Sequence, residues 1–136
     1  MRRFIMSTLQ TFTAPTGRFL LAIMFFMSGL TKISQYAGTQ GYMEAMGVPG
    51  SLLPLVILTE ILGGLAIILG WKTKYASLVL ASFCIFSALL FHTDFSNQAE
   101  MTNFLKNITI AGGFLTLFVY GPGAFALDNR SNKKNP

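Results

Sequence analysis

Charged residues are scarce in this chain. Only 11% of its 136 residues are Asp, Glu, Lys or Arg, whereas 52% are hydrophobic, and ordinary soluble domains carry about 25% charged residues. This composition excludes a typical soluble domain and indicates an integral membrane protein. The formal net charge of +5 does not indicate a nucleic-acid partner, because the basic residues stand at the ends of apolar segments and form no continuous basic face.

Cysteine and histidine each occur once, as Cys84 and His92. A single cysteine excludes an internal disulfide, a C-x-x-C redox pair and a cysteine-rich metal site. A single histidine excludes a haem held by two histidines of the same chain. We therefore predict no metal site, and we interpret Cys84 as an inert buried thiol.

The apolar run Leu52–Leu69 contains a single charge, Glu60. Its eighteen residues approach the ~20 that cross a hydrocarbon core of ~30 Å. A charge near the middle of such a run costs at least about 2.5–3.5 kcal/mol, so we expect Glu60 to face other helices. Gly63 and Gly64 follow on the same side of the helix, where they allow another backbone to approach closely.

Three further apolar segments complete the predicted fold. We expect an all-α, transmembrane four-helix up-down bundle, with helices over Thr16–Tyr36, Leu52–Leu69, Tyr75–Phe91 and Asn103–Tyr120. A Gly-rich loop with a short interfacial helix over Thr39–Met46 joins the first two helices. A polar segment from His92 to Asn103 joins the last two.

The predicted domain is residues 16–128, between an N-terminal tail of residues 1–15 and a basic C-terminal tail of residues 129–136. Most basic residues lie at one end of the predicted helices: Arg2, Arg3, Arg18, Lys72, Lys74, Arg130, Lys133 and Lys134. The positive-inside rule places both tails in the cytoplasm of a bacterium with the protein in its inner membrane. We interpret Arg18 as an anchor that reaches out to the cytoplasmic edge.

The remaining polar residues gather in the outer half of the predicted bundle. At 1.5 Å per residue, Lys32 lies roughly 21 Å from Arg18, and Glu60 roughly 12 Å from the outer end of its helix. The candidate ligand-binding cluster is Lys32, Glu60, His92, Lys106 and Asn107. Lys32 is the expected partner of Glu60, with Lys106 second.

Each candidate also has a structural interpretation. Lys32 and Glu60 could form an ion pair that only sets helix register. His92 and Lys106 could extend outward to water, and Asn107 could form a hydrogen bond between helices. The sequence leaves these alternatives open.

Several short motifs, in order and spacing, resemble the DoxX family of small membrane proteins, and within it the YphA-type inner-membrane proteins. They include R-F-L-L-A from Arg18, S-G-L-T-K from Ser28, E-I-L-G-G from Glu60, G-W-K-T-K from Gly70, F-L-K-N from Phe104 and G-P-G-A-x-x-L-D from Gly121. The resemblance implies four membrane helices and a link to quinone- or sulfur-dependent redox or stress systems. It supplies no catalytic residue set.

Three functions are compatible with these observations. The chain could be a redox accessory protein that binds a quinone head group or a small oxoanion, with no covalent cofactor. It could be a structural or assembly partner in a membrane complex, or a small solute or proton carrier in which Glu60 titrates. We favour the accessory protein, without catalysis of its own, in contact with the bilayer and with a membrane-protein partner or a second copy of itself.

Overall fold

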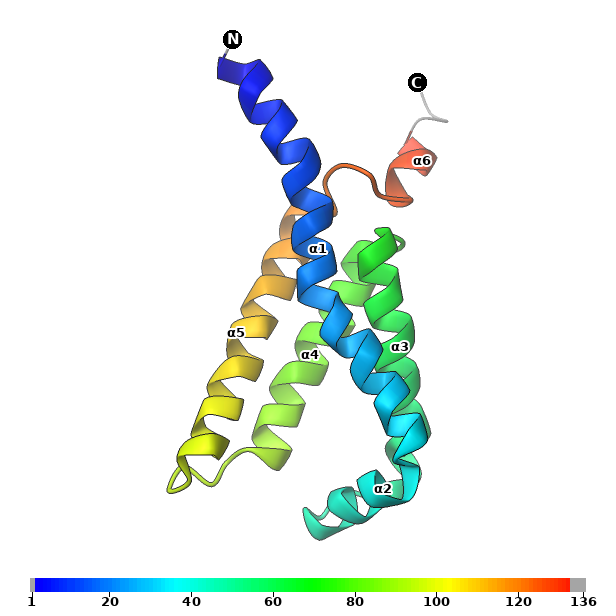
Figure 1. Ribbon diagram of the computed structural model, residues 1–136, viewed down its shortest axis with the longest axis vertical. Helices are drawn as coiled ribbons and strands as arrows, with labels where there is room; N and C mark the ends of the chain where they lie inside the picture. Colours follow the sequence, from blue (N-terminus) through cyan, green and yellow to red (C-terminus); the bar gives the residue numbers. More distant parts are fainter. Residues whose placement is uncertain (1, 133–136) are drawn as a thin grey trace.

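Helices make up all the regular structure of the described residues in this computed structural model, which describes the backbone of residues 2–132 and the side chains of residues 8–130; no strand occurs among them. The elements in chain order are α1 (Arg2–Ser34), α2 (Tyr36–Ala45), the 3₁₀ turn η1 (Gly50–Leu52), α3 (Leu53–Leu69), α4 (Thr73–Phe91), α5 (Gln98–Tyr120) and α6 (Asp128–Asn132). The four long helices run up and down the molecule, and α2 lies across the end opposite α6 (Figure 1).

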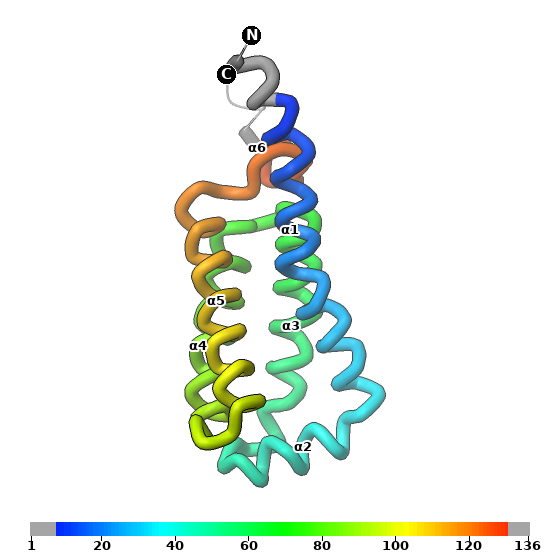
Figure 2. The backbone as a smooth tube through the Cα atoms, turned by 60° about the vertical axis from the view of Figure 1, so that its left-hand side comes forward, coloured from blue at the N-terminus to red at the C-terminus, as the bar shows by residue number. Residues whose placement is uncertain are grey.

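Three helical segments are long and apolar enough to cross a membrane: Thr8–Ser34, Gly50–Leu69 and Thr73–Phe91. They confirm three of the four predicted spans. Helix α5 has 23 residues and lies beside α4 in both views (Figures 1 and 2). Its first half, however, carries Glu100, Asn103, Lys106 and Asn107, which lower its average hydropathy.

Helix α1 begins at Arg2 and not at Thr16, so the prediction of its start was wrong. Pro15 lies inside the helix. Proline lacks an N–H group and is usually found at the beginning or end of a helix. The sequence therefore favoured a helix that begins just after Pro15. The expected short helix over Thr39–Met46 is present as α2. Residues 133–136 of the predicted C-terminal tail, with Lys133 and Lys134, lie outside the described residues, as do the side chains of Arg2 and Arg3.

Helices α1 and α3 pack closely at Gly64, as predicted. A Cβ atom at this position would lie 2.9 Å from the backbone nitrogen of Phe26 and 3.2 Å from the carbonyl oxygen of Ala22. Contacts this short leave no room for any larger residue. Gly29 of α1 faces the same interface and would meet Ile61.

The main hydrophobic core joins α1, α3, α4 and α5. Phe25 of α1 and Phe114 of α5 meet edge to face with ring centroids 5.5 Å apart. One stripe of α4 consists of small residues that are fully buried: Ser77, Ala81, Cys84 and Ala88. His92, which follows on the same stripe, is 17% exposed. Small side chains at these positions allow α4 to lie close to its neighbours.

Arg18 is buried with 2% of its surface exposed, so its predicted role as an outward-reaching anchor is wrong. Its guanidinium donates hydrogen bonds to Ile67 (3.2 Å) and Ile68 (3.0 Å) at the end of α3. It also donates to Ala124 (2.8 Å) and Phe125 (3.0 Å) in the segment that leads to α6. Its five N–H donors in a planar fork suit this role, because the carbonyls at the end of a helix lack partners within the helix. Arg18 therefore ties α1 to α3 and to the C-terminal segment.

At the same end of the molecule, the beginning of α4 is capped by a residue that is distant in the sequence. The backbone N–H groups of Lys72 and Thr73, where α4 begins, donate to the two carboxylate oxygens of Asp128 at 2.6 and 2.9 Å. The lysine side chain cannot cap this helix itself, because it has no acceptor. Desolvation acts to raise the pKa of Asp128, but these hydrogen bonds and the nearby Arg18 guanidinium hold it below its usual value.

Candidate functional site

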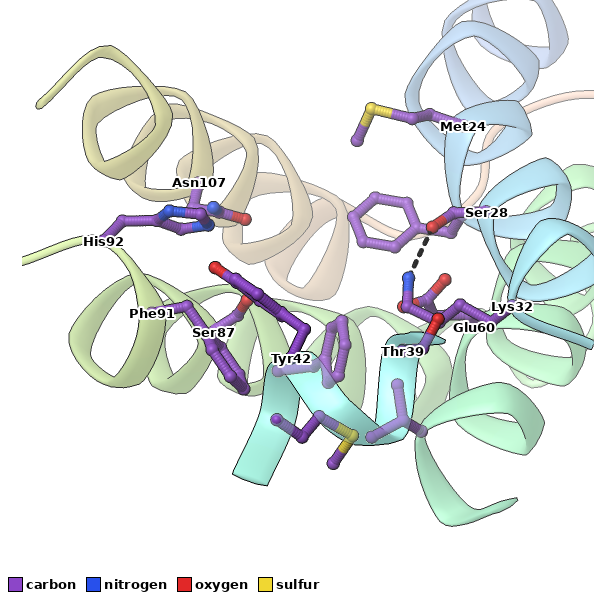
Figure 3. Close-up of a pocket in the computed structure, with 14 residues that line it drawn as sticks. Met24, Ser28, Lys32, Thr39, Tyr42, Glu60, Ser87, Phe91, His92 and Asn107 are labelled. Carbon is purple, nitrogen blue, oxygen red and sulfur yellow. Dashed lines mark hydrogen bonds and ion pairs between the residues drawn. The ribbon is translucent and has the colours of Figure 1, made fainter. Parts of the chain in front are cut away.

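At the opposite end, polar side chains from five helices line one cavity of about 270 Å³, which we call the polar pocket. Its polar lining is Ser28, Lys32, Thr39, Tyr42, Glu60, Ser87, His92 and Asn107, and its apolar walls are Met24, Phe25, Met43, Val56, Phe83 and Phe91. Figure 3 shows Ser28, Lys32 and Glu60 on one side of the cavity and His92 and Asn107 on the other, with Tyr42 between them. Four of the five predicted site residues therefore meet here.

Helix geometry brings Lys32 and Glu60 together across the α1–α3 interface. Lys32 Nζ lies 2.9 Å from Glu60 Oε1, and it donates a hydrogen bond of 2.7 Å to Ser28 Oγ, one turn earlier in α1. The side chain of Glu60 is only 3% exposed, and that of Lys32 is 26% exposed. This confirms the predicted partner of Glu60 and its position inside the protein.

The second carboxylate oxygen of Glu60 is still available for bonding. Oε2 is buried and has no hydrogen-bond partner in the part of the chain that the structure describes. A buried carboxylate oxygen without a donor is costly, because it has lost its hydration. Glu60 therefore can accept a hydrogen bond from a molecule in the pocket.

The opposite side of the pocket holds a second pair, between His92 and Glu100. His92 Nδ1 and Glu100 Oε2 are 2.8 Å apart, with the two side chains 17% and 29% exposed. Sequence reasoning missed Glu100. A local sequence pattern could have indicated it. The Asn97 side chain caps α5 by accepting hydrogen bonds from the backbone N–H groups of Ala99 and Glu100. An acidic residue such as Glu100 is favoured in the first turn after such a cap.

Tyr42 was also missed, and it comes from the short helix α2. Its ring stacks on Phe91 of α4, with centroids 5.5 Å apart and planes 22° apart. Partial burial, and the carboxylate of Glu100 to a smaller extent, raise the pKa of Tyr42. Its hydroxyl therefore stays protonated at neutral pH and can donate a hydrogen bond into the pocket.

Lys106 does not line the pocket, so the structure does not bring it together with the other four candidates. Its side chain is exposed, whereas the adjacent Asn107 lines the cavity. Neighbours on a helix point about 100° apart, because 3.6 residues complete a turn. Asn107 shares the buried side of α5 with Ala111 and Phe114, and Lys106 therefore has to face outward.

The chemistry available in the pocket is hydrogen bonding and charge, without a metal. No group of three or more His, Cys, Asp or Glu side chains is placed to hold an ion among the residues that are described. Lys32, Tyr42, Asn107 and His92 offer donors on different sides of the cavity, between aromatic walls. Such a site suits a small flat molecule with polar atoms at its edges.

Comparison with known proteins gives consistent results. The DoxX family model matches residues 14–93, more than half of the chain, a range that includes Lys32, Glu60 and His92. The inner membrane protein YqjF of Escherichia coli K12 is 49% identical over 129 residues, covering 95% of this chain and 99% of YqjF. The inner membrane protein YphA of the same organism is 32% identical over 121 residues, covering 84% and 86%. No solved structure matches the chain.

Proposed function

This chain belongs to the DoxX family, and from that premise we propose that it is an inner-membrane accessory protein that binds a quinone-type head group in the polar pocket. It serves a redox or stress-response system and has no chemistry of its own. The observation that carries the proposal is the arrangement of hydrogen-bonding groups on opposite sides of an aromatic cavity.

A quinone ring carries two carbonyl oxygens at opposite edges and two flat apolar faces. Lys32 can donate to one oxygen, and Asn107 or His92 to the other. The Tyr42 hydroxyl, which lies between the two sides, can donate a further hydrogen bond to the ring. Phe25, Phe83 and Phe91 supply aromatic walls around the ring. Donors of this kind bind the oxidised ring and also stabilise negative charge on its oxygens during reduction.

The charges in the pocket argue against a small oxoanion, the other ligand that the sequence left open. Lys32 is already paired with Glu60, and His92 with Glu100. Each pair sums to a charge of zero or less, so neither adds a surplus of positive charge that would attract an anion. A neutral ring does not need such a charge.

The topology that goes with this function has four spans and both tails in the cytoplasm. In support, α5 lies beside α4 along its length, and α6 lies at the same end of the molecule as the beginning of α1 (Figure 1). Lys72, Lys74 and Arg130 also lie at that end, and the polar first half of α5 contributes Asn107 to the pocket. The positive-inside rule then puts the polar pocket near the outer side of the membrane.

The test is to measure binding of a short-chain benzoquinone to protein purified in mild detergent. We expect the wild type to bind it, and Tyr42→Phe to bind roughly threefold to tenfold more weakly, because one neutral hydrogen bond is lost. Tyr75→Phe is the matched control, since Tyr75 is 76% exposed and does not line the pocket. Absence of binding, with no quinone extracted from the purified protein, would refute the proposal.

A structural role for the Lys32–Glu60 pair is the second candidate. The pair joins α1 to α3 near Gly29, where the two helices are in contact. It could therefore set helix register whether or not a ligand binds. The double-mutant cycle described below measures this contribution.

A further inference from the structure

A second cavity lies directly beside the polar pocket. It has a volume of about 340 Å³ and opens between α3 and α4, with Leu52 and Leu55 on one wall and Phe86 and Leu90 on the other. We call it the apolar groove. Apart from the hydroxyl-bearing residues Thr59 and Ser87, its lining is apolar. The Thr59 hydroxyl donates a hydrogen bond of 2.8 Å to the carbonyl oxygen of Leu55, so it needs no polar partner from a molecule in the groove.

The two cavities share a wall. Met43, Val56, Phe83, Ser87 and Phe91 line both the polar pocket and the apolar groove. The polar pocket and the groove are thus separated by no more than one layer of side chains. A molecule that occupies both cavities would pass between these side chains, with its polar atoms in the polar pocket and its hydrocarbon part in the apolar groove.

The apolar groove opens toward lipid. It is formed by α3 and α4, which are two of the membrane-spanning candidates. Leu55 and Phe86 each have 63% of their surface exposed, and Leu90 has 49%. Side chains of this kind on a spanning helix face hydrocarbon chains. The end of the polar pocket, in contrast, is covered by Thr39, Tyr42 and Met43 of α2.

We propose that the ligand is a membrane-borne quinone with an isoprenoid tail, which enters sideways from the bilayer and leaves its tail in the apolar groove. This inference rests on the proposed function, because it takes the polar pocket as the site of the head group. The polar pocket, at about 270 Å³, lies at the lower end of the range for small-molecule sites, roughly 300–1,000 Å³, so it suits a head group better than a whole tailed quinone. The adjoining groove supplies the matching space for hydrocarbon.

The experiment compares two ligands on variants that fill the groove. Leu90→Trp places a larger side chain in the apolar groove without touching the polar pocket, because Leu90 lines only the groove. Leu89→Trp is the matched control: Leu89 is 53% exposed and lines neither cavity. The ligands are a tail-less benzoquinone and the same ring with an isoprenoid tail, both measured in nanodiscs of one lipid composition.

We expect Leu90→Trp to raise the Kd of the tailed quinone about tenfold, because the tail loses its packing contacts. The Kd of the tail-less ring should stay within about twofold of its wild-type value, since the polar pocket is unchanged. Partitioning of the tailed quinone into the bilayer is the same for every variant, so it cannot produce a difference between Leu90→Trp and Leu89→Trp. A shift confined to the tailed ligand supports the inference.

The opposite results are equally clear. An unchanged Kd for the tailed quinone on Leu90→Trp, or an equal shift for both ligands, would overturn the inference and leave an ordinary lipid chain as the occupant of the groove. The proposed function would survive that result. If neither ligand bound the wild type, the proposed function itself would fail. Should Leu90→Trp not fold, Leu55→Trp fills the groove from its other wall, with Leu58→Trp as its control.

Discussion

Two cations on α1 are held by different kinds of partner. Arg18 donates to four backbone carbonyls of α3 and of the C-terminal segment. Lys32 instead contacts a carboxylate, Glu60, and a hydroxyl, Ser28. The difference follows from the side chains, because the guanidinium presents five fixed donors while the ammonium is a compact point charge. Arg18 is structural, whereas Lys32 keeps one exposed side toward the polar pocket.

The Lys32–Glu60 pair can be tested by a double-mutant cycle on thermal stability. Lys32→Met alone or Glu60→Gln alone should each cost roughly 2–3 kcal/mol, because each strands an ion or a polar group in a low dielectric. The double variant should cost less than the sum of the two. Lys106→Met serves as the control, since Lys106 is exposed and lies outside the pocket. Strictly additive effects would show that the two side chains do not stabilise each other.

The Asp128 cap predicts a pH dependence with a definite sign. Its pKa in the folded protein lies below the ordinary value of 3.8, so the ionised carboxylate stabilises the fold at neutral pH. As the pH falls through this lowered pKa, protonation weakens the cap and its contribution is lost. Asp128→Asn should therefore be less stable than the wild type at pH 7, by about 1 kcal/mol.

The measurement for Asp128 is the melting temperature in detergent between pH 7 and pH 3. The gap between wild type and Asp128→Asn should begin to narrow as the pH drops below about 4, where the unfolded chain takes up a proton at Asp128, and it should close once the pH falls below the lowered pKa, where both side chains are neutral. Asp94→Asn, in the exposed connection before α5, controls for the general loss of a negative charge. A gap that widened in acid would contradict the cap.

At the scale of the helix, the sequence predicted close packing correctly at Gly64, where α1 and α3 are in contact. The small residues on one stripe of α4, from Ser77 to Ala88, are also buried. On α5 the sequence did not show which side of the helix is buried, because polar residues stand next to each other there. Asn107 faces the pocket and Lys106 does not, a choice that depends on where α5 packs against α4.

The packing of α1 on α3 predicts different outcomes for two glycines. Gly64→Leu should destabilise the protein by about 1–3 kcal/mol, because the new side chain would push against the backbone of α1 at Phe26 and Ala22. Gly112→Leu is the matched control, since nothing lies within 4 Å of a Cβ at Gly112. Melting in detergent measures both. Equal melting temperatures for the two variants would mean that α1 and α3 do not approach closely at Gly64.

Other parts of the site depend on contacts between distant parts of the chain. The carbonyls that bind Arg18 come from residues 49 to 107 positions away, and Tyr42 reaches the pocket only because α2 turns beneath the long helices (Figure 2). No local pattern carries that information. The Lys32–Glu60 pair could be predicted because membrane depth restricts which charges can meet, and depth can be counted from the sequence at 1.5 Å per residue.

At the scale of the whole molecule, the two ends have different roles. The end with α6 is held by backbone hydrogen bonds through Arg18 and Asp128. The end with α2 contains the polar pocket, the Lys32–Glu60 ion pair and the close contact between His92 and Glu100. In the proposed orientation, the pocket lies near the outer surface and the structural end near the cytoplasm. This separation lets ligand binding and structural support occupy different depths of the membrane.

The orientation is tested by reporter fusions at two positions, Lys133 and near Gln98. With four spans and the basic end inside, a phosphatase reporter should be active near Gln98 and inactive at Lys133, because the enzyme works only outside the cytoplasm. A fluorescent reporter that folds only in the cytoplasm should give the reverse pattern. The physical reason for this expectation is the excess of Lys and Arg at the α6 end, which the positive-inside rule places on the cytoplasmic side.

The pair of sites also decides whether α5 crosses the membrane. If only Thr8–Ser34, Gly50–Leu69 and Thr73–Phe91 cross, the chain ends on the same side as Gln98, and both fusions report the same compartment. That result would refute the four-span topology. Opposite signals with reversed signs would keep four spans and overturn the orientation. A fusion within the basic turn at Lys74 is the internal control, because it should match Lys133 only if α5 returns the chain to the cytoplasm.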